Sequence, residues 1–177
     1  MPTILRKCPF FETHTTALVA GGGVTVRPYQ IIVWVSLHPM GRPDLSPNAP
    51  RFPAILDSGH SHNFSIAEEH LARWAGFAPG ALRTLGSVRI TGRRVPLLAA
   101  NVWIHRNQAG QRDVFTERPA FCIQLDSGIA VYPEGAPAIP RLPLLGLRGL
   151  RRAALQLHID CRKCRVDLHT AHPFWPF

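Results

Sequence analysis

The chain has 177 residues, of which 46% are hydrophobic and 18% are charged. This composition excludes a disordered chain and predicts one globular domain with a sizeable core. No apolar run is long enough to cross a bilayer, so we expect no membrane partner. The formal net charge is +9, but most basic residues are scattered along the chain. We therefore interpret the charge as a solvated basic surface, and a nucleic-acid partner is not expected.

The cysteine content and the N-terminus indicate a reducing compartment. Four cysteines are too few for a disulfide scaffold in a chain of this size. The N-terminal residues contain no apolar signal core, so we expect a cytoplasmic protein. The predicted organisation is an N-terminal arm over residues 1–28, one domain over residues 29–170 and a C-terminal tail over residues 171–177.

The first predicted elements are two strands that flank a proline-rich loop. Residues 30–37 (QIIVWVSL) are rich in β-branched side chains, and residues 51–56 form a second apolar stretch. The second stretch is apolar on both faces, which is typical of a buried central strand. A helix is expected next, with Ser65 as its N-cap, Glu68 in a capping-box position and Gly76 as its stop.

The later residues predict further strands and a second short helix. Alternating apolar residues indicate the strands, and turn residues mark the boundaries between them. The predicted segments are strands at residues 87–90, 95–104, 120–125, 128–132, 155–159 and 165–168, and a helix through Leu147, Leu150 and Ala154. Mostly strands with two short helices predict a mainly β, barrel-like domain.

The most informative motif directly follows the strand at residues 51–56. Asp57 begins an Asp-Ser-Gly triplet, and the sequence then continues HSHNF. Far downstream, residues 142–146 (LPLLG) form another apolar stretch that opens the second predicted helix. A carboxylate at the tip of a rigid strand can act as an acid or a base, and Gly59 permits the sharp turn that places it there.

Together these motifs resemble those of the retropepsin-like aspartic proteases, the retroviral and retroelement type. The run DSGHSHNF is similar to DSGASHNF in that family, and LLGLRGL resembles its Leu-Gly-x-x-x-Leu helix start. The similarity covers about residues 30–168. It implies a closed β-barrel of the acid-protease fold and a homodimer with its active site on the interface. It also implies hydrolysis of a peptide or protein substrate without a cofactor.

The resemblance assigns roles to individual residues. Asp57 from each subunit would form a catalytic pair that shares one proton, in which one member activates water and the other protonates the carbonyl oxygen. The other assigned residues belong to the active-site loop (Ser58, Gly59 and His60), to the flap (Ile90, Thr91, Gly92 and Arg93) and to the structure near the site (Leu144, Leu145 and Gly146).

Two features leave alternatives open. His60 stands where the family has a small residue, so it would crowd the cleft or favour the ionised carboxylate through its charge. A chain that kept the barrel and the dimer but had lost catalysis would be a non-catalytic interaction module.

Asp126 begins a second Asp-Ser-Gly copy, which we interpret as a β-turn, with an intramolecular dyad of Asp57 and Asp126 as the alternative.

Residues near the C-terminus offer a weaker alternative. Cys161, Cys164, His169 and His172 form a C-x2-C-x4-H-x2-H pattern, and zinc prefers these ligand types. The gap before His169 is shorter than in the usual zinc fingers. We therefore interpret the cysteines as two thiols at an exposed turn, with a zinc-binding module as the alternative.

Overall fold

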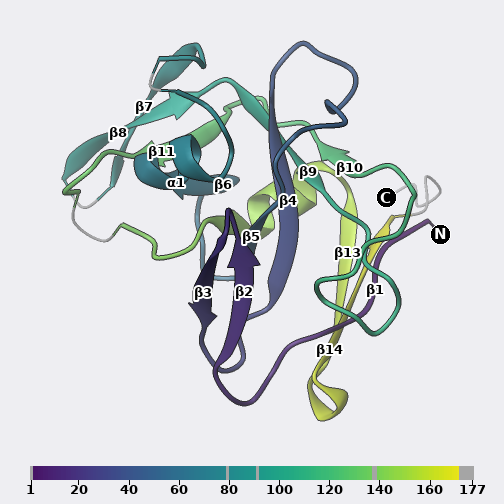
Figure 1. Cartoon of the computed structure of the whole chain (residues 1–177). Coiled ribbons are helices and arrows are strands. Elements are labelled where there is room, and N and C mark those ends of the chain that lie inside the picture. Colours follow the sequence, from purple (N-terminus) through teal and green to yellow (C-terminus); the bar gives the residue numbers. More distant parts are fainter. Residues whose placement is uncertain (1, 79, 91, 137–138, 172–177) are drawn as a thin grey trace.

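The computed structural model of the chain describes residues 2–78, 80–90, 92–136 and 139–171 (Figure 1). Within these ranges the fold is mainly β with two short α-helices, as the sequence predicts. The elements in chain order are β1 (Thr3–Pro9), β2 (Thr15–Val19), β3 (Gly22–Val26), β4 (Ile32–Pro39), β5 (Phe52–Asp57), β6 (Phe64–Ala67), α1 (Glu68–Arg73), β7 (Thr84–Ile90), β8 (Arg93–Leu98), β9 (Ala100–Ile104), β10 (Phe121–Ile123), β11 (Ile129–Tyr132), β12 (Leu144–Gly146), α2 (Leu147–Arg152), β13 (Leu155–Asp160), the 3-10 turn η1 (Cys161–Lys163) and β14 (Arg165–Thr170).

Nine strands form the largest sheet, in the order β10-β9-β4-β5-β12-β6-β11-β8-β7. Within the described ranges, β10 and β7 are the two edge strands of this sheet. The other strands form a three-stranded sheet, β1-β14-β13, and the β2–β3 hairpin. Figure 1 shows the three-stranded sheet and the β7–β8 hairpin on opposite sides of the molecule, with β4 between them. In the described part of the chain, every helix is too short or too polar to cross a membrane.

β4 and β5 lie in the core, and most of their residues are apolar. Every β4 residue except the last is buried, and Phe52 and Ala54 of β5 are fully enclosed. The two strands pair antiparallel, with Ile32 opposite Ile55. Both predicted strands are therefore confirmed, with boundaries shifted by one or two residues.

β12 lies between β5 and β6, parallel to β5 and antiparallel to β6. Gly146, its last residue, stands opposite Asp57 in the register with β5. A Cβ atom on Gly146 would lie 2.1 Å from the carbonyl oxygen of His62 and 2.8 Å from that of His60. Only glycine therefore permits this close passage of the two chain segments.

The predicted capping role of Ser65 is wrong. Ser65 lies in β6, where it stands opposite Ala130 of β11 and Leu144 of β12. The helix α1 begins at Glu68, and its N-cap, Ala67, makes no side-chain capping bond. Strand pairing on both sides satisfies the backbone of this segment, and that outweighs one local capping bond.

The residues before position 29 are not the loose arm that the sequence predicted. β1 pairs with β14, and β2 and β3 form a hairpin that turns at Gly21, where φ is +76°. Ile4, Leu5 and Cys8 of β1 are buried. The physical reason is that the partner of β1 is β14, at the other end of the chain, so no local pattern signals the pairing.

The predicted hairpin of residues 87–90 and 95–104 is only partly correct. Its second segment divides into β8, which pairs with β7 and β11, and β9, which pairs with β4 and β10. The break falls at Ala99, whose backbone N–H donates to Arg83 O at 2.8 Å and whose carbonyl accepts from Met40 N at 3.1 Å. These two bonds lead the chain from one part of the sheet to the other.

We expect Gly146→Ala to lower the free energy of unfolding by about 3 kcal/mol, because the added Cβ pushes two backbone segments apart. Gly22→Ala is the matched control, since an added Cβ there would have no neighbour nearer than 3.8 Å. The control should change the free energy by less than about 0.5 kcal/mol. Urea denaturation followed by tryptophan fluorescence measures both values, and equal stability of the two variants would contradict the close passage.

Candidate active site

Asp57 is the last residue of β5 and therefore stands at the tip of a buried strand. Its side chain is half-buried, and Oδ1 accepts a hydrogen bond of 2.9 Å from Gly59 N. The Asp57 carbonyl accepts a bond of 3.3 Å from His60 N, which closes the turn. Within the described residues, Oδ2 makes no hydrogen bond. One carboxylate oxygen is thus oriented by the turn, and the other is available for chemistry.

An open pocket of about 400 Å³ lies against this turn. Asp57 and Ser58 line it from the turn, and Leu144 lines it from β12. Tyr29, which is 63% exposed, lines it from the segment before β4. Sequence analysis missed Tyr29 because it lies outside the motifs, at the boundary between the predicted arm and the first predicted strand.

The segment Leu144, Leu145 and Gly146 lies beside the Asp57 turn, where the resemblance placed it. Gly146 stands opposite Asp57, and Leu145 is completely buried. Gly146 N donates a hydrogen bond of 3.0 Å to the carbonyl oxygen of Asn63, in the chain that leads away from the turn. β12 therefore holds both the strand that enters the turn and the segment that leaves it.

His60 is directed toward β6: its Nε2 lies 2.8 Å from Ser65 Oγ. It is not among the residues that line the Asp57 pocket, so it does not crowd that space. Burial and the neighbouring His62 lower the pKa of His60 to about 4, while Asp57 has the opposite, smaller effect. The imidazole is uncharged near neutral pH, so a positive charge on His60 does not act on Asp57 there.

Three side chains near the turn, those of Ser65, Asn63 and Ser127, form hydrogen bonds that the sequence did not predict. Ser65 Oγ shares its hydrogen bond with His60. Burial raises the pKa of Tyr132, and the nearby Ser65 hydroxyl has a smaller, opposite effect. Asn63 Nδ2 donates to Ser127 Oγ at 2.9 Å. Ser127 belongs to the second Asp-Ser-Gly copy, so the two copies are joined through Asn63. No spacing in the sequence signals contacts between segments this far apart.

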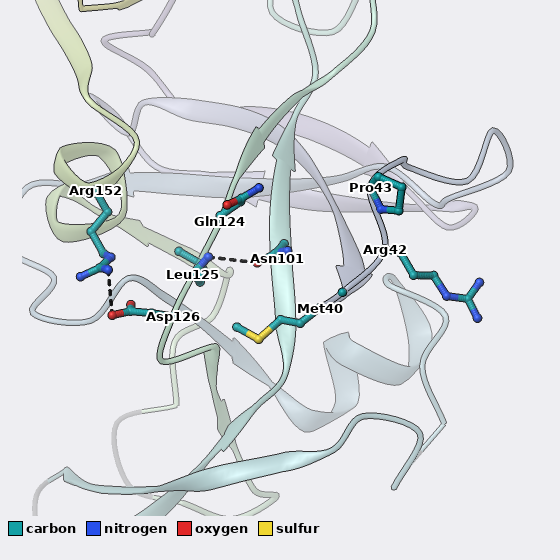
Figure 2. Close-up of a pocket in the computed structure, with 9 residues that line it drawn as sticks. Met40, Arg42, Pro43, Asn101, Gln124, Leu125, Asp126 and Arg152 are labelled. Atoms are coloured by element: carbon teal, nitrogen blue, oxygen red, sulfur yellow. Dashed lines mark hydrogen bonds and ion pairs between the residues drawn. The ribbon is translucent and has the colours of Figure 1, made fainter.

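Asp126 lies in a different environment from Asp57. It lines an open pocket of about 630 Å³ together with Met40 and Asn101 (Figure 2). Its Oδ2 forms an ion pair of 2.8 Å with Arg152 of α2, and its Oδ1 accepts a hydrogen bond of 2.9 Å from Ser127 N. Both carboxylate oxygens are therefore engaged within the chain.

The second Asp-Ser-Gly copy forms a turn, as predicted. Gly128 N donates to Leu125 O at 3.3 Å, and Gly128 has φ +68°. A Cβ on Gly128 would lie 2.1 Å from Leu98 O, so glycine is required by packing as well as by conformation. Asp126 and Asp57 line no common pocket. The described structure thus gives no support to an intramolecular dyad.

The hairpin expected as a flap is β7–β8, with Ile90 opposite Arg93. Gly92 has φ +81°, which suits a tight hairpin turn, and Thr91 lies outside the described residues. Arg93 Nη1 donates to Gly135 O at 3.4 Å. The apolar side chains of the hairpin pack against β11, so its base is anchored, and among the described residues the bond from Arg93 is the one side-chain hydrogen bond near its tip.

Three of the candidate zinc ligands, Cys161, Cys164 and His169, lie in the described part of the chain, and they do not form a group that could hold a metal ion there. Cys161 is exposed, and Cys164 Sγ donates to Cys161 O at 3.6 Å within the η1 turn. His169 Nδ1 lies 3.2 Å from Thr3 Oγ1, and His172 is outside the described residues. Among the residues with described positions, no three His, Cys, Asp or Glu side chains are grouped to hold a metal ion. The two cysteines lie at the η1 turn, where Cys161 is exposed and Cys164 is half-buried.

Comparison of the chain with models of protein families, with curated proteins and with solved structures finds no match. Function must therefore follow from the geometry of the site. That geometry consists of one carboxylate at the tip of a buried strand, oriented by its own turn, supported by a crossing strand and open to solvent.

We expect the free energy of unfolding to fall as the pH decreases from 6.5 to about 4, because His60 stays neutral in the folded chain while it is protonated in the unfolded chain. The folded pKa is below the unfolded one, so this stabilisation is complete above the unfolded value and is lost on acidification. His60→Gln, which can still bond to Ser65, should remove about 1 kcal/mol of the pH dependence. Urea midpoints at neutral and acidic pH measure it, and an unchanged slope would contradict a neutral His60.

Proposed function

We propose that the protein is a retropepsin-like aspartic endopeptidase that hydrolyses peptide bonds as a homodimer. The observation that carries this proposal is the passage of β12 beside Asp57. β12 pairs with the strand that enters the Asp-Ser-Gly turn and bonds to the segment that leaves it. One oxygen of the Asp57 carboxylate has no partner in the described chain. A rigid, solvent-open carboxylate at a strand tip is what acid–base hydrolysis of a peptide requires.

The homodimer follows from the need for two carboxylates in this chemistry. Within one chain, the other Asp-Ser-Gly carboxylate, Asp126, is paired with Arg152 and belongs to another pocket. A second copy of the chain would bring its own Asp57 to the open side of the first. Tyr29 and Leu147 are exposed apolar residues, one in the Asp57 pocket and the other next to Gly146, and their burial would favour such an interface.

In this mechanism the two Asp57 carboxylates share one proton, because two negative charges so close together do not both ionise readily. The ionised member removes a proton from a water molecule, which attacks the carbonyl carbon of the substrate. The protonated member donates its proton to the carbonyl oxygen. The resulting pKa values belong to the pair and not to either residue alone. Both roles are filled by carboxylates, so the proposal includes no cofactor.

The β7–β8 hairpin is proposed to cover the bound substrate, and the nine-stranded sheet to be the barrel of the fold. The anchoring of the hairpin to β11 supports the first point, since β11 also pairs with β6, the strand that follows the Asp57 turn. Movement at the tip would require the loss of one bond between Arg93 and Gly135. A lid of this kind would exclude bulk water and keep the attacking water molecule with the substrate.

We expect Asp57→Asn to reduce cleavage of a diverse peptide library by at least about a thousandfold, because a neutral amide cannot serve as a base. Asp126→Asn is the matched control: it breaks a half-exposed ion pair with Arg152, so stability should change by less than about 1 kcal/mol and activity should remain. Cleavage is measured between mildly acidic and neutral pH, with and without a pepstatin-type inhibitor.

Equal loss of activity in both variants would replace this proposal by an intramolecular dyad. Absence of cleavage from a folded, dimeric wild type would instead identify a non-catalytic interaction module.

A mixing experiment tests the two-chain site directly. Wild type combined with an excess of Asp57→Asn should lose activity per wild-type subunit, roughly in proportion to the dilution, because most wild-type chains then pair with an inactive partner. The same excess of Asp126→Asn should have no such effect. If activity per wild-type subunit stayed constant while the subunits exchanged, each chain would hold a complete site and the dimer mechanism would be wrong.

A further inference from the structure

A separate pocket of about 310 Å³ lies over β9, between the loop at residues 44–51 and the loop at residues 116–120. It shares no lining residue with the pocket at the tip of β5. Its walls include Arg51, Arg106 and Arg118, and we call it the arginine pocket. We propose that the arginine pocket binds a small organic anion, whose phosphate or carboxylate group is held by these three guanidinium groups.

The three arginines are without acidic partners: none of them forms an ion pair in the described part of the chain. Arg106 is held in place because it donates to two backbone carbonyls, one of them Pro119 O at 3.0 Å. The Arg51 guanidinium lies 5.0 Å from the centre of the Phe115 ring. Burial and then the charge of Arg118 lower the pKa of Arg106. A bound anion would relieve this repulsion between like charges.

Trp103 also lines the pocket, and its indole Nε1 is enclosed by the protein. Its side chain is buried, with 9% exposure, and Nε1 has no acceptor among the described residues. A buried N–H group without an acceptor costs free energy and is rare in folded proteins.

His105, which also lines the pocket, contributes an acceptor and not a charge. Ser36 Oγ donates to Pro50 O at 2.7 Å, so it must accept the bond of 2.8 Å from His105 Nε2. The proton therefore sits on Nε2, and Nδ1 carries a lone pair. Burial and Arg51 lower the pKa of His105 to about 4, in agreement with a neutral ring. A hydroxyl or amino group of the ligand can donate to such a nitrogen.

The acidic residues of the pocket narrow the class of ligand. Asp44 and Glu117 also line it, and neither forms an ion pair in the described chain. They would accept hydrogen bonds from hydroxyl or amino groups, and they would repel a long polyanion such as a nucleic acid. The volume suits a compound of the size of a sugar phosphate. The ligand is therefore an anion that carries hydroxyl or amino groups.

Calorimetric titration of the full chain at physiological salt tests this site, with inorganic phosphate, ribose 5-phosphate and citrate as probes. At least one probe should bind, and the order of affinities separates a phosphate from a carboxylate ligand. Arg51→Gln and Arg118→Gln should each weaken binding about tenfold, since each removes a charge-assisted hydrogen bond. Arg83→Gln, an exposed arginine that lines none of the pockets described above, removes the same charge and should leave affinity unchanged.

Trp103→Phe gives a second test, because Trp103 lines the pocket and its fluorescence responds to a ligand bound there. The tryptophan fluorescence of the wild type should change when the probe is added, and the variant should lose most of that change. The proposal is overturned if none of the three probes binds at millimolar concentration. It is also overturned if Arg83→Gln weakens binding as much as Arg51→Gln, since the attraction would then come from general surface charge.

Discussion

Gly146 lies so close to the carbonyl oxygens of His60 and His62 that no side chain fits there, and this contact lets β12 run between β5 and β6. β12 is the link in the strand order between the β10-β9-β4-β5 part of the large sheet and the β6-β11-β8-β7 part. The same strand stands beside Asp57. The position of Gly146 has no room for a side chain. The glycine there thus allows both the continuous strand order of the sheet and the placement of the Asp57 carboxylate.

The two Asp-Ser-Gly copies show how tertiary surroundings give one tripeptide different roles. Around Asp57, the turn engages one carboxylate oxygen, and the described chain leaves the other free. Around Asp126, Ser127 N and Arg152 engage both oxygens. The first copy follows a strand buried in the core, whereas the second joins β10 to β11. Asn63 bonds to Ser127, so the second copy serves as structural support for the segment that follows the first.

The basic residues of the chain differ in whether they are charged and in whether a carboxylate pairs with them. His60 and His105 are both held neutral by burial, so neither adds to the net charge of +9 near neutral pH. Arg112 and Arg152 are neutralised by carboxylates. The arginines of the arginine pocket have no such partner in the described chain. A net charge computed from composition does not distinguish between these groups, because it ignores both burial and pairing.

The sequence by itself determined the mainly β class, the buried strands β4 and β5, and the candidacy of Asp57, because apolar periodicity and turn residues act over a few neighbouring positions. Only the tertiary structure decided the pairing of β1 with β14, the place of Ser65 in a strand, the neutral state of His60 and the ion pair of Asp126. Each of these depends on contacts between segments far apart in the chain. Such contacts set burial, hydrogen-bond partners and electrostatics, and local patterns in one sequence do not encode them.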